Sequence, residues 1–278
     1  MSIAGGLHLA LERGRELGCG AVQIFLKNQR QWAAKPLTPD ETRTFTEARR
    51  ATAIRHVFAH SSYLINLGNP DPSLWAQAVT AFTDELERAE ALGLSCVVIH
   101  PGSHMGAGLE AGLGRVTAAL DESLARTAGY RVKVALENTA GQGTQIGVRF
   151  DQLARLVAET PDGDRLRVCL DTQHAFAAGY DLRSAEGYAA MVAELERTVG
   201  VERLVAFYLN DAKKGLGSRV DRHEHIGRGE LAPGAFRRLL RDPRFRDLPM
   251  CLETPKTPDP DDHRDDRRNL AVLRKLLA

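Results

Sequence analysis

The chain has 278 residues, of which 43% are hydrophobic, and its formal net charge is +1 at neutral pH. This length and apolar content suit one large core, such as that of a (β/α) barrel. No apolar run approaches about 18 residues, which argues against a membrane-spanning helix. The near-zero charge neither favours nor excludes a nucleic-acid partner, for which only a local basic patch would argue.

Cysteine usage and the first residues indicate a cytoplasmic protein. Cys96, Cys169 and Cys251 lie inside apolar runs, and no two cysteines form a C-x-x-C pair. This pattern is typical of a reducing compartment. The N-terminus has neither the basic start nor the apolar segment of a signal peptide. Because the sequence shows no interdomain linker, we expect a single barrel domain over residues 1–278. The sequence gives no sign of an oligomer, so we expect a monomer.

The first elements in chain order are a helix over residues 7–17 and a strand over residues 21–26. The six residues before the helix are rich in Gly and Ala and do not predict a strand. The loop after the strand, residues 27–32, is polar and basic and contains Arg30 and Trp32. This loop is either a solvated turn or a surface that contacts phosphate through Arg and stacks on a base through Trp.

Two further signals follow. Residues 38–41, Thr-Pro-Asp-Glu, predict a helix start with a capping box. After the strand that ends at His60, the loop over residues 61–68 exposes Tyr63 and Leu64. This second loop is either a hydrophobic staple over the rim of a barrel or a wedge that enters a nucleic-acid stack.

A carboxylate or an imidazole recurs at the end of successive apolar runs. The runs end at His60, His100, Glu137, Asp171, Tyr208 and Glu253. The spacing between these ends is that of one strand plus one helix, which predicts parallel strands joined by helices. Because a ring of parallel strands brings its C-terminal ends to one face, we expect an α/β fold of the TIM (β/α)8 type with its chemistry on that face.

Three more candidates lie in the segments that follow these strands. His174 stands three residues after Asp171, although an aspartate at this position is also a common helix N-cap. Residues 211–228 are charged and irregular, as functional or disordered loops are, and they carry Asp221 and His223. An Asp-x-His pair in one loop can supply two ligands to one ion.

Imidazoles and carboxylates therefore converge on one predicted rim: His60, His100, Glu137, Asp171, His174, Asp221, His223 and Glu253. Without a cation, these carboxylates would repel one another. Mixed nitrogen and oxygen ligands are typical of zinc or manganese, and the set exceeds what one tetrahedral ion takes, so we expect two or three ions. Such a cluster suits phosphodiester hydrolysis. A sugar isomerase or epimerase, which needs only one or two ions and a base, is the alternative.

The motifs around this rim resemble the endonuclease IV family of apurinic/apyrimidinic endonucleases, which are zinc-dependent DNA repair enzymes on a TIM barrel. The matching segments are Lys27–Trp32, Ser62–Gly68, His100–His104, Glu137–Gly143, Asp171–Asp181, Leu209–Asp211, Gly217–His223 and Leu252–Thr254. Each segment is long and specific, and the match runs from Ala4 almost to the C-terminus.

The resemblance implies a metal scheme residue by residue. His60 and His100 would hold one zinc ion, and Glu137 would bridge it to a second. Asp171 and Glu253 would complete the second ion, with Glu137 and Glu253 as the catalytic residues. Manganese in place of zinc at one site is an alternative.

A third ion would be held by His174, Asp221 and His223. The implied reaction is hydrolysis of the phosphodiester bond 5′ to an abasic site in double-stranded DNA, which leaves a 3′-hydroxyl and belongs to base excision repair.

The resemblance also assigns DNA contacts. Arg30, Tyr63 and Leu64 would enter the minor groove, bend the duplex and help to flip the abasic nucleotide out. Such a nucleotide is cheap to extrude because it has no base to unstack.

Two departures from the family pattern affect these expectations. The family has a histidine ligand of the second zinc where this chain has Tyr208, and a neutral phenol is a poor zinc ligand. The second ion would then be weaker, be completed by water, or be a different metal. The family also begins with a strand that is missing before Ala4 here, which we expect to reflect a start placed too late, since an open barrel exposes unpaired edge groups. Together, these departures leave a catalytically impaired DNA-binding relative as a further alternative.

Overall fold

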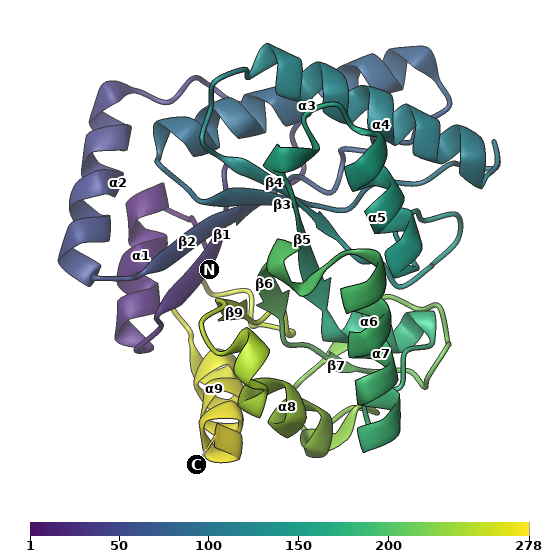
Figure 1. Cartoon of the computed structure of the whole chain (residues 1–278). Coiled ribbons are helices and arrows are strands. Elements are labelled where there is room, and N and C mark those ends of the chain that lie inside the picture. Colours follow the sequence, from purple (N-terminus) through teal and green to yellow (C-terminus); the bar gives the residue numbers. More distant parts are fainter. Residues whose placement is uncertain (278) are drawn as a thin grey trace. The chain divides into compact units, whose positions relative to one another are not determined.

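The structure is a computed structural model that describes residues 1–277 (Figure 1). The chain divides into two compact units. Unit 1 comprises Met1–Leu136 and Leu156–Arg167, and unit 2 comprises Glu137–Arg155 and the chain from Val168 onward. The expectation of a single barrel domain over residues 1–278 stays a prediction.

Unit 1 is built on parallel strands that pair in chain order. The strands are β1 (Ala21–Phe25), β2 (His56–His60), β3 (Cys96–Ile99) and β4 (Lys133–Glu137), whose last residue opens unit 2. The helices are α1 (Leu7–Glu16), α2 (Pro39–Thr52), α3 (Pro72–Ala91) and α4 (Leu109–Arg126). The strand residues are almost all buried, as expected of a parallel sheet.

The sequence signals for the first elements are confirmed. Helix α1 and strand β1 occupy the predicted ranges, and the described residues before α1 form no strand. At the start of α2, the Thr38 hydroxyl accepts the Glu41 N–H over 3.2 Å, and the Glu41 carboxylate accepts the Thr38 N–H over 2.8 Å. This reciprocal capping box fixes the point where the loop after β1 ends and the helix begins.

Unit 2 continues the alternation of parallel strands and helices. Its strands are β5 (Leu166–Asp171), which starts at the end of unit 1, β6 (Leu204–Tyr208) and β9 (Met250–Cys251). Its helices are α6 (Thr172–Ala178), α7 (Ala185–Thr198), α8 (Ala232–Arg241) and α9 (Arg264–Leu277), while α5 (Phe150–Glu159) has residues in both units. Short 3₁₀ turns cover Gly163–Arg165, Val201–Arg203 and Pro243–Phe245.

The stretch 211–228 contains two short strands, so the prediction of an irregular segment is wrong at those residues. Strands β7 (Asp211–Ala212) and β8 (His223–Glu224) pair in antiparallel fashion. The buried Asp211 carboxylate accepts the backbone N–H groups of Gly227, Gly229 and Leu231 over 2.9, 3.1 and 3.0 Å. These bonds tie both ends of the stretch together, so that the segment carrying Asp221 and His223 is a braced hairpin.

The apolar runs form the core as expected. Cys96, Cys169 and Cys251 are buried among the aliphatic and aromatic side chains of the strands and helices. None of the helices in residues 1–277 is long and apolar enough to cross a membrane.

Candidate metal centre

Asp171 ends β5, is buried in unit 2 and caps the helix that follows, as one of its two interpretations predicts. Its carboxylate accepts the His174 N–H over 2.8 Å and thereby caps α6. Its second oxygen accepts the side-chain amide of Asn210. The backbone of Asp171 is held by Asn138, whose side chain bonds both its N–H and its carbonyl over 2.7 and 3.1 Å. Asp171 is therefore an N-cap whose carboxylate also belongs to a cluster of candidate ligands.

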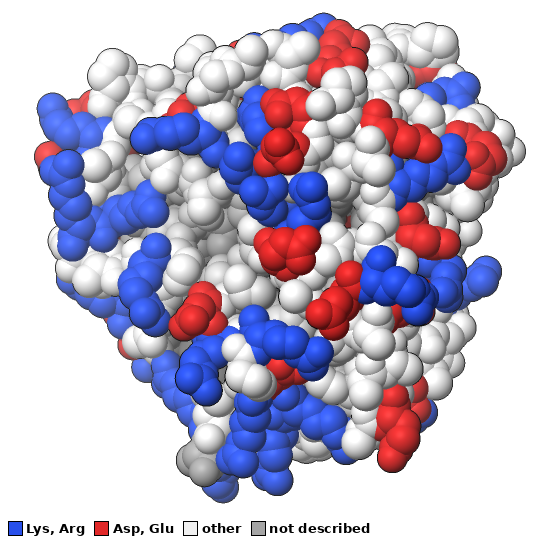
Figure 2. Space-filling view, viewed as in Figure 1, with Lys and Arg blue, Asp and Glu red and all other residues white. Residues whose placement is uncertain are grey.

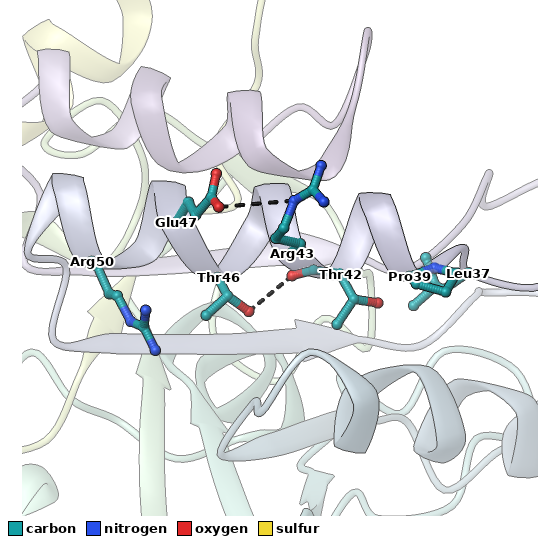
Figure 3. Close-up of a pocket in the computed structure, with 7 residues that line it drawn as sticks. All are labelled: Leu37, Pro39, Thr42, Arg43, Thr46, Glu47 and Arg50. Carbon is teal, nitrogen blue, oxygen red and sulfur yellow. Dashed lines mark hydrogen bonds and ion pairs between the residues drawn. The ribbon is translucent and has the colours of Figure 1, made fainter.

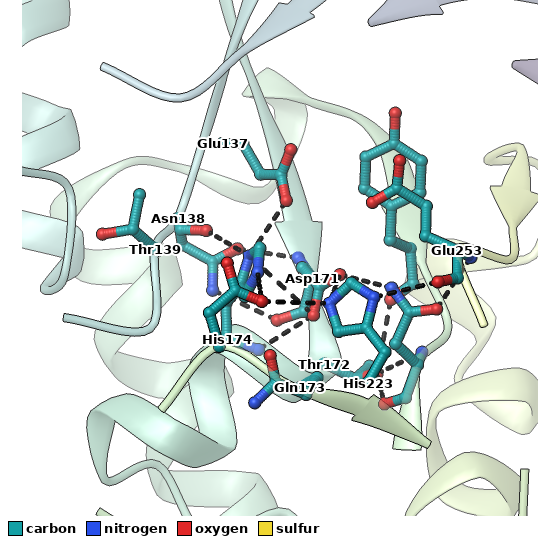
Figure 4. A network of polar contacts seen from close by, with 12 residues as sticks. Glu137, Asn138, Thr139, Asp171, Thr172, Gln173, His174, His223 and Glu253 are labelled. Carbon is teal, nitrogen blue, oxygen red and sulfur yellow. Dashed lines mark hydrogen bonds and ion pairs between the residues drawn. The ribbon is translucent and has the colours of Figure 1, made fainter. Parts of the chain in front are cut away.

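His174 lies between carboxylates in unit 2 (Figure 4). Its Nδ1 is 2.9 Å from the Asn138 carbonyl and 3.0 Å from Oε1 of Glu137. Its Nε2 is 3.4 Å from Oδ1 of Asp221. Burial lowers the pKa of His174, but Asp171, Asp221 and Glu137 together outweigh it and hold the pKa well above its usual range. The carboxylates around His174 therefore favour a positive charge at this position, which a proton or a metal cation can supply.

His223 presents one nitrogen to the same cluster. Its Nδ1 is 3.0 Å from the Glu253 carbonyl, which orients the ring. Its Nε2 lies 3.7 Å from Oδ2 of Asp171 and 3.7 Å from Oδ1 of Asp221. This buried nitrogen has no hydrogen-bond partner among residues 1–277. These separations are too long for hydrogen bonds but close to those between two ligands of one tetrahedral zinc, about 3.4 Å.

The donor set of unit 2 fits divalent metal ions. Ligand atoms of Asp171, His174 and His223 lie within 4.8 Å of one another, and so do those of Glu137, Asp171 and Glu253. Nδ1 of each imidazole lies at a backbone carbonyl and Nε2 faces carboxylates of the cluster, an arrangement that orients metal-binding histidines, although Nδ1 of His174 also lies 3.0 Å from Oε1 of Glu137. Asp171 belongs to both groups.

Unit 1 brings the other two candidate histidines together. His60 ends β2, and His100 directly follows β3. Their ring centroids are 5.4 Å apart in an edge-to-face arrangement, and Nδ1 of His60 lies 2.7 Å from the Ser61 carbonyl. The Tyr63 ring contacts both, at 5.1 and 6.2 Å between centroids. The predicted histidine pair thus exists within unit 1, and its role as a ligand pair is a proposal.

Tyr208 ends β6 and is fully buried. It is paired in register with Asp171 on one side and with Cys251 on the other. Burial, followed by the negative charges of Glu253 and Glu137, raises the pKa of Tyr208 well above its usual range. The side chain is therefore a neutral phenol at the strand end, as expected from the sequence.

The predicted DNA contacts lie on exposed loops of unit 1. Arg30 is exposed at a turn in which its N–H donates to the side chain of Asn28 over 3.0 Å. Tyr63 is 56% exposed, which is unusual for so large a ring, and Leu64 beside it is half-buried. An exposed aromatic side chain next to an arginine loop is consistent with a contact surface.

Asn138 and Asn210 are the residues that sequence analysis missed. Each binds Asp171, and Asn210 also accepts the Glu253 N–H over 2.8 Å. Asn138 directly follows the apolar run that ends at Glu137, and Asn210 lies two residues after the run that ends at Tyr208. This position after a strand end is the one sequence signal that could have found them.

Two surface features lie outside the ligand cluster. A shallow pocket on the surface of α2 is lined by Leu37, Pro39, Thr42, Arg43, Thr46, Glu47 and Arg50 (Figure 3). It has no imidazole or thiol and one carboxylate, which pairs with Arg43 over 3.9 Å, so it is not a candidate metal site. Figure 2 shows Lys and Arg side chains spread over one face, with Asp and Glu between them, in keeping with the small net charge.

Comparison with known proteins identifies the family. The sequence matches the family described as Xylose isomerase-like TIM barrel over residues 11–276. Over its full length it is 50% identical to the probable endonuclease 4 of Chloroflexus aurantiacus and covers 96% of that protein. Endonuclease IV from Thermus thermophilus superimposes with a TM-score of 0.87 at 41% identity, covering 100% of this chain and 97% of that one. The chain belongs to the endonuclease IV family.

Membership of the endonuclease IV family confirms the predicted TIM-barrel fold and makes the chain a nuclease, and therefore a hydrolase. The probable endonuclease 4 of Geobacter sulfurreducens, 46% identical over the full chain with 93% of that protein covered, supports the same assignment. A D-tagatose 3-epimerase-like protein also superimposes, with a TM-score of 0.75 at 19% identity over 99% of this chain and 94% of that one. That likeness shows the fold alone.

Proposed function

We propose that this endonuclease IV family chain is a metal-dependent DNA repair endonuclease that hydrolyses the phosphodiester bond 5′ to abasic sites in double-stranded DNA and leaves a 3′-hydroxyl. The observation that carries the proposal is the cluster of imidazoles and carboxylates in unit 2, formed by Glu137, Asp171, His174, His223 and Glu253. The family membership supports the reaction class.

The candidate ligands would hold two or three zinc ions, with manganese as an alternative at one position. In this scheme His60 and His100 would hold one ion, Glu137 would serve that ion and a second, and the remaining ligands would be Asp171, His174, Asp221, His223 and Glu253. When bound, the ions supply Lewis-acid chemistry, lowering the pKa of water and neutralising charge on the phosphate oxygens.

The chain's own residues prepare this site before DNA binds. The carbonyls of Asn138 and Glu253 set the tautomer of His174 and His223 by accepting from Nδ1. Asn210 joins the Asp171 carboxylate to the backbone of Glu253. Because these supports are buried, the ligands need no reordering on metal binding, and that preorganisation favours catalysis.

Substrate recognition is proposed for the exposed loops of unit 1. Arg30 would contact phosphate or the minor groove, and Tyr63 with Leu64 would form the wedge that bends the duplex. We also propose that the protein acts in the cytoplasm, for which the cysteine pattern, typical of a reducing compartment, is the support from sequence, and that it acts as a monomer.

The test is incision of an end-labelled duplex carrying one abasic analogue, with zinc or manganese supplied and a chelator control. We expect a single metal-dependent cut 5′ to the lesion. Glu137→Ala is expected to abolish the cut, since it removes the proposed bridge, while an undamaged duplex stays intact. A folded, metal-loaded protein that binds abasic DNA without cutting it would refute the proposal and favour a non-catalytic relative.

A further inference from the structure

A buried ion-pair network lies beside the exposed loops of unit 1. The Lys27 ammonium, just after β1, is 2.7 Å from Oδ2 of Asp84 and 3.6 Å from Oε1 of Glu85. Asp84 and Glu85 belong to α3, and the side chains of Lys27 and Glu85 are almost completely buried. A buried lysine is costly unless it is paired, so this contact fixes the first residues of the loop that follows β1.

Glu85 also reaches the loop after β2. Its Oε1 accepts the Ser62 N–H over 3.3 Å. The Ser62 hydroxyl then donates to the Gln29 carbonyl over 2.8 Å and accepts the Leu64 N–H over 3.3 Å. A single buried carboxylate thus joins the backbone next to Tyr63 and Leu64 to the loop that carries Arg30.

Arg88, one turn further along α3, holds the far side of the first loop. Its Nε binds both oxygens of Asp84 at 3.0 Å. Its Nη2 donates to the carbonyls of Ala34 and Lys35 over 3.2 and 2.6 Å. The loop is therefore anchored at Lys27, at Gln29 and at residues 34–35, and its tip, residues 30–33, lies between the last two of these anchors.

We infer that Asp84, Glu85 and Arg88 are positioning residues that hold the loop over residues 26–38 and the loop over residues 61–64 as one rigid DNA-binding surface. The inference rests on the proposed function for its ligand, double-stranded DNA. Ordering a loop on binding costs conformational entropy for every residue that becomes fixed, so anchors already formed in the free protein reduce the entropy cost of DNA binding.

Ser62→Ala and Arg88→Lys test this inference in the metal-loaded, full-length protein. Ser62→Ala removes the hydroxyl that links the two loops. Arg88→Lys removes the guanidinium group that donates to the carbonyls of Ala34 and Lys35. Each loses one or two hydrogen bonds, so we expect KM for an abasic duplex to rise about threefold to tenfold. We expect kcat at saturating DNA and the metal content to stay unchanged, because neither residue is a proposed ligand.

Two matched controls separate positioning from general stability. Ser123→Ala replaces another buried serine, on α4. Arg165→Lys replaces another arginine that is 6% exposed, as Arg88 is, and that donates to carbonyls, here those of Leu124, Thr127 and Val132. Neither control touches the two loops, so both are expected to leave KM unchanged even where they lower the melting temperature.

Limited trypsin digestion gives a readout that does not depend on DNA. Cleavage after the exposed Arg30 is expected to be faster in Ser62→Ala and Arg88→Lys than in wild type and both controls. If wild type fails to cut abasic DNA, the proposed function is wrong, and this digestion still tests the anchoring. Unchanged cleavage at Arg30 in both variants would overturn the inference. So would an unchanged KM, or a fall in kcat together with metal loss.

Discussion

The Nδ1 nitrogen of His223 lies 3.0 Å from the carbonyl oxygen of Glu253. One candidate ligand therefore orients its ring on the backbone of another, although they come from strand β8 and from the segment after β9. The Asn210 side chain accepts the N–H of the same Glu253 and donates to the carboxylate of Asp171, so Asp171 is connected to the other two candidate ligands. The ligand cluster is thus a connected network, and single changes in it are expected to have separable effects on metal binding and folding.

Asp171→Asn is expected to abolish tight metal binding while the fold survives. Asparagine caps helices as well as aspartate does, so α6 keeps its N-cap. The new amide would face the Asn210 amide, which we expect to cost about 1–2 kcal/mol in the free energy of unfolding. Metal analysis after gel filtration and melting in chelator check this, and a variant that keeps the wild-type metal content would contradict the assignment.

The metal-free and metal-loaded proteins are expected to respond to pH in opposite directions. The neighbouring carboxylates raise the pKa of His174 against the effect of burial. In chelator, the stabilisation from this imidazolium is fully present below about pH 6.5 and is lost as the pH rises through the raised pKa. Metal must displace that proton, so metal affinity is expected to rise with pH.

Calorimetric titration of the metal in buffers of different ionisation enthalpy measures the protons released. His174→Gln is the matched variant and is expected to release fewer. Equal proton release from wild type and from His174→Gln would show that His174 carries no displaced proton.

Tyr208→His is expected to increase the number of tightly bound ions or to strengthen the weakest one. The buried phenol stays neutral because burial and nearby carboxylates raise its pKa, so it offers no anionic oxygen at neutral pH. An imidazole at the end of β6 adds a ligand beside Asp171 and Cys251, which are its partners in register. Competition with a chromophoric chelator measures the affinities, with Tyr208→Phe as control. Equal metal affinity in the histidine and phenylalanine variants would rule out a ligand position here.

Asp211→Asn is expected to loosen the hairpin that presents Asp221 and His223. The carboxylate, at the start of the segment, accepts the N–H groups of Gly227, Gly229 and Leu231 at its end, and an amide offers only one acceptor oxygen. We expect a loss of about 2–4 kcal/mol in the free energy of unfolding, together with weaker metal binding. Asp242→Asn, which alters another buried carboxylate, at the end of α8, is the control for stability alone. Metal affinity that falls equally in both variants would argue against a specific brace.

Arg30→Ala is expected to weaken binding to abasic DNA about tenfold with no change in metal content. The side chain is exposed, so its removal should shift the free energy of unfolding by less than about 0.5 kcal/mol. Fluorescence anisotropy with a labelled duplex at two salt concentrations measures the loss, and Arg126→Ala, on the exposed face of α4, is the matched control. Unchanged affinity in Arg30→Ala would remove this residue from the proposed interface.

The sequence by itself determined the strand ends and the residues that stand there. Apolar runs of strand length, each followed by a helix, predict parallel strands. Parallel strands have their C-terminal residues at the same edge of the sheet. That local rule placed His60, Asp171 and Glu137 at the ends of β2, β5 and β4. The capping box at Thr38 was equally readable, because all of its partners lie within four residues.

Only the tertiary structure decided which side chains support those residues. The bond between Asn210 and Asp171 spans 39 positions, and the pair of Lys27 with Asp84 spans 57. The hairpin of β7 and β8 escaped prediction because two-residue strands show no periodicity. Hydrophobic periodicity determines which face of a helix or strand is buried. A contact between buried polar groups depends instead on how elements that are distant in the sequence pack together. No local pattern in a single sequence encodes that packing.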